Sequence, residues 1–173
     1  MWTGKWVVVA VALAMLGCSQ KPEPTTSAPL TAWWVDIQFQ PGPTKARGFD
    51  ARSVDKNWTH ISALDADMLK GRVPDQEIEA FRKSGFSFSL KSDLDGDGVQ
   101  EDFFVGVYET NRGEHGRFVA IARNGRVVKH FAESGTASFS ALQQGDGEVH
   151  WYKCMECSDF DTIRWSGENF TLE

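Results

Sequence analysis

The chain is poor in basic charge, in cysteine and in long apolar runs, and each shortage excludes a class of protein. Its 24 Asp and Glu residues outnumber its 18 Lys and Arg residues, so the formal net charge is −6. Nucleic-acid-binding domains favour a basic patch, and electrostatic docking on anionic lipid also needs clustered cations. The apolar run over residues 6–16 is shorter than the ~20 residues of a membrane-spanning helix. We therefore expect no nucleic-acid partner and no permanent transmembrane span.

The sequence also lacks the short motifs of common enzymes. It contains no Gly-x-Ser-x-Gly elbow, no His-Glu-x-x-His pair and no Gly-rich phosphate loop before a helix. Its four histidines, His60, His115, His130 and His150, stand in no recognisable catalytic motif. We therefore predict a protein that is not an enzyme, and a cell-envelope hydrolase is the less favoured alternative.

Cysteine occurs at three positions, and their spacing limits the available roles. Cys154 and Cys157 form a Cys-x-x-Cys motif, whereas Cys18 stands alone near the amino terminus. A structural zinc site needs four ligands, and the chain has no second Cys-x-x-Cys and no closely spaced His pair. A thioredoxin-like motif belongs to a βαβ pattern, but residues 150–153 and 158–161 beside this motif are strand-like. We predict a local disulfide between Cys154 and Cys157, with a redox or metal role as the alternative.

The first 18 residues have the pattern of an export signal. Lys5 precedes the apolar run, and the small residue Gly17 leads into Cys18, as in a secretory signal with its cleavage site. Residues 15–18, Met-Leu-Gly-Cys, resemble the lipobox of bacterial lipoproteins. This resemblance implies that residues 1–17 are removed and that Cys18 carries the lipid, palmitate included. Because Ser19 follows Cys18 and is not Asp, the same analogy favours the outer membrane.

Residues 19–31, which follow this cysteine, are polar and rich in proline. That composition is typical of an extended linker. We expect residues 18–31 to form a lipidated tether and residues 32–173 to form a single β-rich domain. The acyl chains would then be the membrane contact.

Hydrophobic alternation predicts mostly strands in the body of the chain. The expected strands are 33–39, 86–90, 103–108, 117–123, 126–131, 137–142, 149–154, 162–165 and 169–172. The expected helices are 61–69 and one that Pro74 opens and Gly85 closes. Asn124-Gly125 is the dipeptide that a type I′ hairpin prefers. The predicted fold class is α+β, mostly β: an antiparallel meander curled into a small barrel or sandwich, with one or two short amino-terminal helices.

One loop, residues 93–102, carries a regular pattern of carboxylates. Asp occupies loop positions 1, 3 and 5, Gly98 at position 6 allows a sharp turn, and position 7 can offer a backbone carbonyl. Hard oxygen ligands at this density suit Ca²⁺, and carboxylates so crowded would repel one another without a cation. The alternative is a solvated acidic turn. The predicted Ca²⁺ ligands are Asp93, Asp95, Asp97, Val99, Glu101 and Asp102.

The flanks distinguish this loop from an EF-hand. Position 12 is Phe104, where an EF-hand has a bidentate Glu, and strands are predicted on both sides. Residues 93–105 instead resemble the Ca²⁺ loop of FG-GAP and VCBS repeats, which joins two strands in integrin-like β-propellers. That family has Asp at position 9, where this chain has Glu101 followed by Asp102. The loop occurs once, so the resemblance implies a structural Ca²⁺ and not a whole propeller.

These features together predict a lipid-anchored, exported protein of the bacterial cell envelope. Its domain would be a calcium-stabilised binding or structural module that faces the periplasm or the cell surface. Five tryptophans follow the signal: Trp33, Trp34, Trp58, Trp151 and Trp165. Most of them are expected in the core, and any exposed ones could stack on a glycan or dock an envelope protein. An inhibitor or immunity protein for an exported enzyme is the alternative function.

Overall fold

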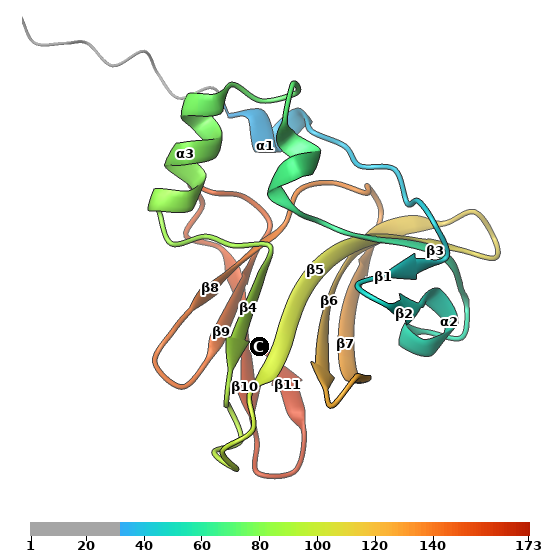
Figure 1. Cartoon of the computed structure of the whole chain (residues 1–173), viewed down its shortest axis with the longest axis vertical. Helices are drawn as coiled ribbons and strands as arrows, with labels where there is room; N and C mark the ends of the chain where they lie inside the picture. Colours follow the sequence, from blue (N-terminus) through green and yellow to red (C-terminus); the bar gives the residue numbers. More distant parts are fainter. Residues whose placement is uncertain (1–31) are drawn as a thin grey trace, which may run out of the picture.

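The computed structural model describes residues 32–173, so the expected signal, Cys18 and the tether lie outside the described residues. The described part is α+β and mostly β, with antiparallel sheets in a sandwich-like arrangement that does not close into a barrel (Figure 1). This confirms the predicted fold class and selects the sandwich over the barrel. Within residues 32–173, no helix combines the length and apolar character needed to cross a membrane.

The larger sheet has five strands, and the longest of them organises it. The strands are β3 (Trp58–Ala63), β4 (Ser89–Ser92), β5 (Glu101–Thr110), β6 (His115–Arg123) and β7 (Arg126–Ser134). Their order is β3-β5-β6-β7, and β4 also pairs with β5. β4 pairs with the first half of β5 and β3 with its second half, so one side of β5 serves two partners. All of these pairings are antiparallel.

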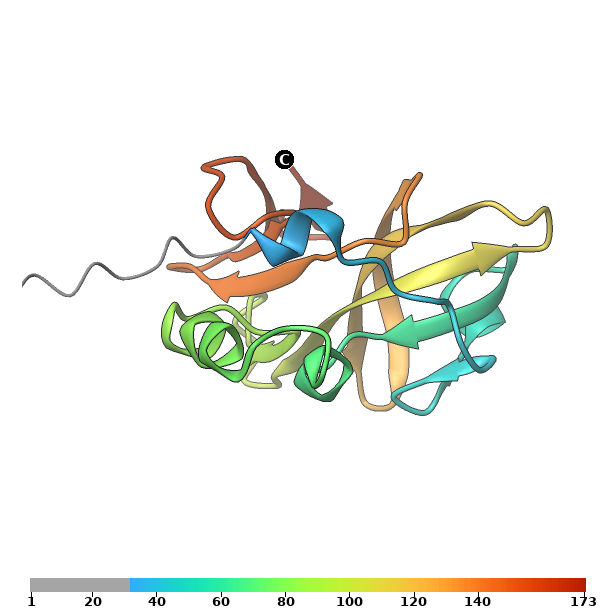
Figure 2. The same cartoon turned by 90° about the horizontal axis from the view of Figure 1, so that it is seen from above.

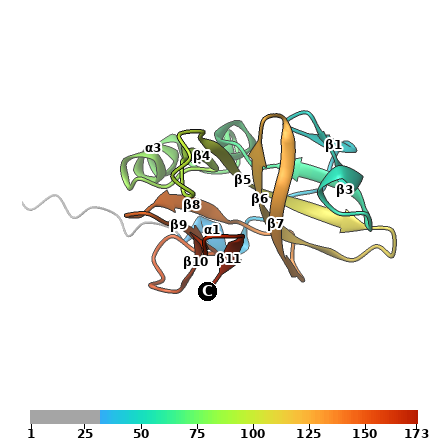
Figure 3. The same cartoon turned by 90° about the horizontal axis from the view of Figure 1, so that it is seen from below.

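The second sheet is built by the carboxyl-terminal part of the chain. Its strands are β8 (Ala141–Gln144), β9 (Val149–Tyr152), β10 (Phe160–Trp165) and β11 (Phe170–Leu172). Their order β11-β10-β9-β8 is a simple meander. An isolated bridge between Ser87 and Leu142 brings the chain before β4 beside β8. Seen from below, the two sheets lie face to face at one side and separate at the other (Figure 3).

Short helices and a small hairpin complete the fold. The helices α1 (Trp33–Asp36) and α3 (Asp75–Lys83), with the 3₁₀ helix η1 (Ala66–Leu69), lie at one end of the sandwich (Figure 2). The hairpin β1 (Lys45–Ala46) and β2 (Phe49–Asp50) leads into α2 (Ala51–Val54). We call residues 45–54 the flap, because they cover the outer face of the larger sheet (Figure 1).

The buried residues form two cores, one on each face of β5. Phe103, Val105 and Val107 face the main core between the sheets, which α1 and α3 also enter. Phe104 and Tyr108 face the opposite way, toward a second core under the flap. Side chains of a strand point alternately to its two faces, so β5 is buried on both sides and serves as the centre of the domain.

A group of charged side chains ties the two sheets together; we call it the sheet-junction network. Arg117 on β6 donates from Nε to Glu133 Oε2 on β7 at 2.9 Å. The Lys153 ammonium lies 3.1 Å from Glu133 Oε1 and also pairs with Asp161 on β10. Its nitrogen lies 4.4 Å from the centre of the Trp151 ring. The network therefore connects β6 and β7 to β9 and β10.

Two of the expected strands lie further along the chain: β4 starts at Ser89 and β8 at Ala141, where residues 86–90 and 137–142 were expected. Two other local predictions were wrong. Residues 33–39 do not form a strand: Trp33 to Asp36 form α1, and only Gln38 pairs in a bridge, with Ser138. The neighbours Trp33 and Trp34 are both buried, which a half-buried strand cannot achieve because its side chains alternate. In the other segment, residues 61–63 belong to β3 and only Ala66–Leu69 are helical.

Other local predictions were confirmed. The helix α3 begins directly after Pro74 and ends at Lys83. Asn124 and Gly125 both have positive φ angles, 50° and 74°, as a type I′ hairpin requires. Four of the five tryptophans are buried and Trp165 is half-buried. Most of the tryptophans therefore serve the core and not an exposed aromatic face.

Candidate metal centre

The acidic loop joins β4 to β5, at the end of the sandwich opposite α1 and α3 (Figure 1). Gly96 and Gly98 have φ angles of 73° and 86°, in the left-handed region that glycine adopts without a steric cost. The carboxylate of Asp93 accepts hydrogen bonds from the backbone N–H groups of both glycines, each at 2.9 Å. Asp97 accepts from the N–H of Val99 at 2.8 Å. The loop is therefore curled around the Asp93 carboxylate.

Three carboxylates converge inside this curl. One oxygen each of Asp93, Asp95 and Glu101 lies within 4.8 Å of the others. Glu101 is the first residue of β5 and shares the face of Phe103 and Val105, so its side chain points inward and is fully buried. Its Oε2 accepts a hydrogen bond from the Leu94 N–H at 3.2 Å. We call Asp93, Asp95 and Glu101 the acidic triad.

Arg123, the last residue of β6, reaches the same place from the neighbouring strand. Its Nε donates to Glu101 Oε1 at 2.9 Å, and Nη1 donates to Asp97 Oδ2 at 3.2 Å. Nη2 also pairs with both Asp95 and Glu101. The hydrogen bond from Arg123 lowers the pKa of Asp95 below its ordinary value, and Asp95 and then Glu101 raise the pKa of Arg123. One guanidinium therefore neutralises part of the loop's charge.

The predicted ligands divide into two groups. The acidic triad is brought together, and Asp97 joins it through Arg123. Asp102 is not brought in: its carboxylate lies 2.9 Å from the Lys91 ammonium, its cross-strand partner on β4. Neighbouring residues of a strand point to opposite faces, so Glu101 and Asp102 cannot both enter the loop. Val99, which was predicted to offer its backbone carbonyl, has a residue exposure of 40%.

Sequence reasoning missed Arg123 because it lies 22 residues beyond Glu101. The Asn124-Gly125 turn predicts that Arg123 ends a strand, but it does not say which strand lies beside that end. The pairing of β5 with β6 supplies this information: Asp102 stands opposite Ala122, so Arg123 falls next to Glu101. The signal in the sequence is that Arg123 is the last residue of a predicted hairpin strand.

The donor set fits a hard divalent cation, with one condition. Carboxylate oxygens are the ligands that Ca²⁺ and Mg²⁺ prefer, and Ca²⁺ takes 6–8 of them with carbonyls and water. The triad would hold such an ion and neutralise its charge. However, Arg123 already bonds the carboxylates of Asp95 and Glu101. A divalent ion therefore fits in place of the guanidinium and not beside it.

The cysteine pair lies in the turn between β9 and β10. The Cα atoms of Cys154 and Cys157 are 5.7 Å apart and their sulfurs are paired, a spacing within the usual range for disulfides. The flanking segments are strands, as expected. Oxidation of the two thiols in the cell stays a prediction.

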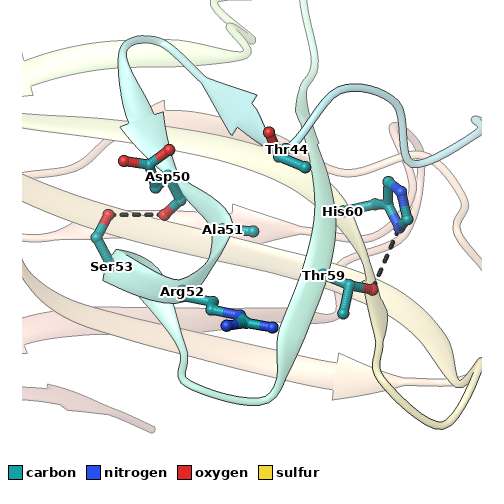
Figure 4. A pocket seen from close by; sticks show the side chains of 7 residues that line it. All are labelled: Thr44, Asp50, Ala51, Arg52, Ser53, Thr59 and His60. Carbon is teal, nitrogen blue, oxygen red and sulfur yellow. Dashed lines mark hydrogen bonds between the residues drawn. The ribbon is translucent and has the colours of Figure 1, made fainter.

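A cavity of about 730 Å³ opens between the flap and β3 (Figure 4). It is lined by Thr44, Asp50, Ala51, Arg52, Ser53, Thr59 and His60. Ser53 donates to the backbone oxygen of Asp50 at 2.6 Å, whereas His60 lies beside Thr59 on the other side of the opening (Figure 4). Within the cavity, the Thr59 hydroxyl lies 3.2 Å from Nδ1 of His60 (Figure 4). The Ser53 hydroxyl does not meet this imidazole and instead bonds to its own helix start.

Comparison with known proteins adds no relative. No protein-family model, no curated protein and no solved structure matches this chain. Two resemblances therefore stay predictions from the sequence. Residues 93–105 resemble FG-GAP and VCBS loops, and residues 15–18 resemble a lipobox.

Proposed function

We propose that this chain is an exported, lipid-anchored, non-catalytic module whose acidic loop binds one structural Ca²⁺. The observation that supports it best is the convergence of the acidic triad, in which the Glu101 carboxylate is fully buried. A buried carboxylate is costly unless a cation or several donors compensate it. In the structure Arg123 and the Leu94 N–H compensate Glu101. A divalent ion would take the place of Arg123 and compensate all three members of the triad at once.

The ion would act on folding and not on a reaction. The loop joins β4 to β5, and β5 is buried in both cores. An ion held by Asp93 and Asp95 from the loop and by Glu101 from β5 would fix the start of this central strand. The module could then bind an envelope protein or glycan, and a rigid loop end would favour a defined binding surface.

Calcium dependence can be measured on the full chain purified in detergent. Binding to the folded state alone contributes RT ln(1 + [L]/Kd), about 1.4 kcal/mol when free Ca²⁺ is ten times Kd. For a chain of this size, that raises the melting temperature by about 3–6 °C. Calorimetry should detect a site with a Kd of roughly 0.1–1 mM, as in extracellular calcium modules.

The Asp93→Asn variant tests a predicted Ca²⁺ ligand without removing a partner of Arg123, because Arg123 pairs with Asp95, Asp97 and Glu101. We expect Asp93→Asn to abolish most of the calcium-dependent rise in melting temperature. Asp146→Asn is the matched control, since Asp146 is also an exposed aspartate in a glycine-rich turn. Equal melting curves of the wild type in EDTA and in millimolar Ca²⁺, with no heat of binding, would reduce the loop to an acidic turn.

The lipid anchor needs a separate test. We expect Cys18→Ala to leave unprocessed precursor that retains residues 1–17 and takes up no labelled palmitate, because the residue that carries the acyl chains is lost. Replacement of the neighbouring Ser19 by Ala is the control and should preserve processing. Normal processing of Cys18→Ala with unchanged detergent partitioning would exclude lipidation at this residue.

A further inference from the structure

We infer that a polar cavity at the carboxyl end of β5 binds one sugar residue, either as a free sugar or as part of a glycan chain. The inference rests on the proposed function in one respect, that the module binds a partner, and it needs neither calcium nor the lipid anchor. The cavity has a volume of about 360 Å³, which lies within the range of small-ligand pockets. It lies at the end of β5 that points away from the acidic loop (Figure 1).

Segments that are far apart in the sequence form the walls of this cavity. The turn after α2 contributes Asp55, and β7 contributes the small apolar side chain of Ala132. The end of β5 contributes Tyr108, and the β5–β6 turn contributes Arg112 and Glu114. The pairing of β5 with β6 and of β6 with β7 brings these residues together.

The Tyr108 ring is held firmly at the base of the cavity. The residue is only 5% exposed, and its ring is stacked on that of Trp58 from the neighbouring strand. On the other side of β5, its cross-strand partner is Gly116, where a Cβ atom would come within 2.7 Å of the Tyr108 ring. The hydroxyl makes no hydrogen bond with any residue of the described range 32–173. A buried tyrosine usually finds a partner for its hydroxyl, so this one is available to a ligand.

Two carboxylates face this hydroxyl. Burial raises the pKa of Tyr108, and the charges of Glu114 and Asp55 raise it further, so the phenol stays protonated and can donate a hydrogen bond. Asp55 Oδ2 lies 3.3 Å from Nε2 of His130, and Glu114 Oε2 accepts a hydrogen bond from the Thr110 hydroxyl at 3.4 Å. These contacts orient both carboxylates. Each carboxylate has about four lone-pair sites, so both keep acceptor capacity for a ligand.

The mixture of donors and acceptors determines the class of ligand. Tyr108 and Arg112 offer donors, whereas Asp55 and Glu114 offer acceptors. A hydroxyl group both donates and accepts, so a sugar ring that carries several hydroxyls can use all four side chains. The two carboxylates disfavour an anion, and the guanidinium disfavours a simple cation. Because the aromatic faces are buried, the sugar would be recognised by hydrogen bonds and not by stacking.

Tyr108→Phe is the sharpest variant, because it removes the hydroxyl and keeps the packed ring. Loss of this one hydrogen bond should weaken sugar binding about threefold to tenfold. Glu114→Gln is a second variant at an exposed position of the β5–β6 turn, where folding is little affected. It removes a charged acceptor and should weaken binding by about tenfold or more. The control is Tyr152→Phe, the same change at the other tyrosine of the chain, whose hydroxyl donates to Gln143 on the second sheet.

Binding can be measured by titration calorimetry on the full chain, in a detergent without a sugar headgroup. The probes are glucose, galactose, mannose and N-acetylglucosamine, each as the monosaccharide and as a short oligomer, in EDTA and in millimolar Ca²⁺. We expect at least one of them to bind in both solutions, more weakly to Tyr108→Phe and Glu114→Gln but equally to Tyr152→Phe. Tighter binding of the oligomer would identify a glycan chain as the source, and equal binding would identify a single sugar residue.

Two results would overturn the sugar site. One is the absence of binding for every probe, and the other is an affinity that neither Tyr108→Phe nor Glu114→Gln changes. Either result leaves the calcium site standing, because no residue of the acidic loop lines this cavity. The melting curves in EDTA and Ca²⁺ test the calcium site separately, and their failure would not remove sugar binding in EDTA.

Discussion

Removal of the Trp58 side chain should remove much of the stability of the domain. Trp58 begins β3, is only 3% exposed and belongs to the second core under the flap. Its ring is stacked on that of Tyr108, with 4.3 Å between the centroids, and lies 4.9 Å from the ring of Phe118. It therefore joins the edge strand β3 to both β5 and β6.

The size of the effect follows from burial and from these contacts. Replacing a buried Trp by Ala costs about 3–5 kcal/mol, and each aromatic pair is worth about 0.5–1.5 kcal/mol beyond its buried area. With Tyr108 and Phe118 as ring partners, we expect Trp58→Ala to cost about 4 kcal/mol of unfolding free energy. Trp58→Phe keeps a ring over Tyr108 and should cost less than half as much.

Urea unfolding followed by far-ultraviolet circular dichroism measures the loss. With a slope of about 2 kcal/mol per molar urea, 4 kcal/mol lowers the midpoint by about 2 M. Val128→Ala is the control, because Val128 is 50% exposed and surface changes usually stay within about 0.5 kcal/mol. A loss below about 1 kcal/mol for Trp58→Ala would show that the flap does not form a cooperative core with the larger sheet.

The sheet-junction network and the cysteine pair give further predictions. Burial raises the pKa of Glu133, but the hydrogen bonds from its arginine and lysine partners outweigh burial and leave this pKa below its ordinary value. Its contribution to stability is thus present above pH ~4.3 and is lost as the pH falls through the folded-state pKa. Glu133→Gln should lower the unfolding free energy measured with urea at pH 7 by about 1 kcal/mol or less, since the side chain is 40% exposed. This difference from the wild type should vanish below pH ~4, and a difference independent of pH would contradict the charge argument. The Cys154–Cys157 pair should resist alkylation without reductant in protein from an oxidising compartment, as mass measurement can test, and two free thiols or bound zinc would contradict it.

The sequence alone determined the local elements whose signals lie within a few residues. Pro74 and Gly85 bound the helix α3, and Asn124-Gly125 sets the register of the β6–β7 hairpin. The spacing of Asp93, Asp95 and Asp97 predicted a curled loop, and the curl is present. In each case the backbone conformation depends on residues that are close in the chain, so a pattern can encode it.

The tertiary structure decided which distant residues meet. Trp33 and Trp34 are helical because both rings enter the main core, and this burial outweighs the alternation that predicted a strand. The register of β5 turned Glu101 into the loop and Asp102 toward β4, and it brought Arg123 to the carboxylates. The sequence therefore predicted a cluster of negative charge that needs a cation, but only the pairing of β5 with β6 showed that the chain provides one cation itself. Strand pairing joins residues that are far apart in the chain, and no local pattern carries that information.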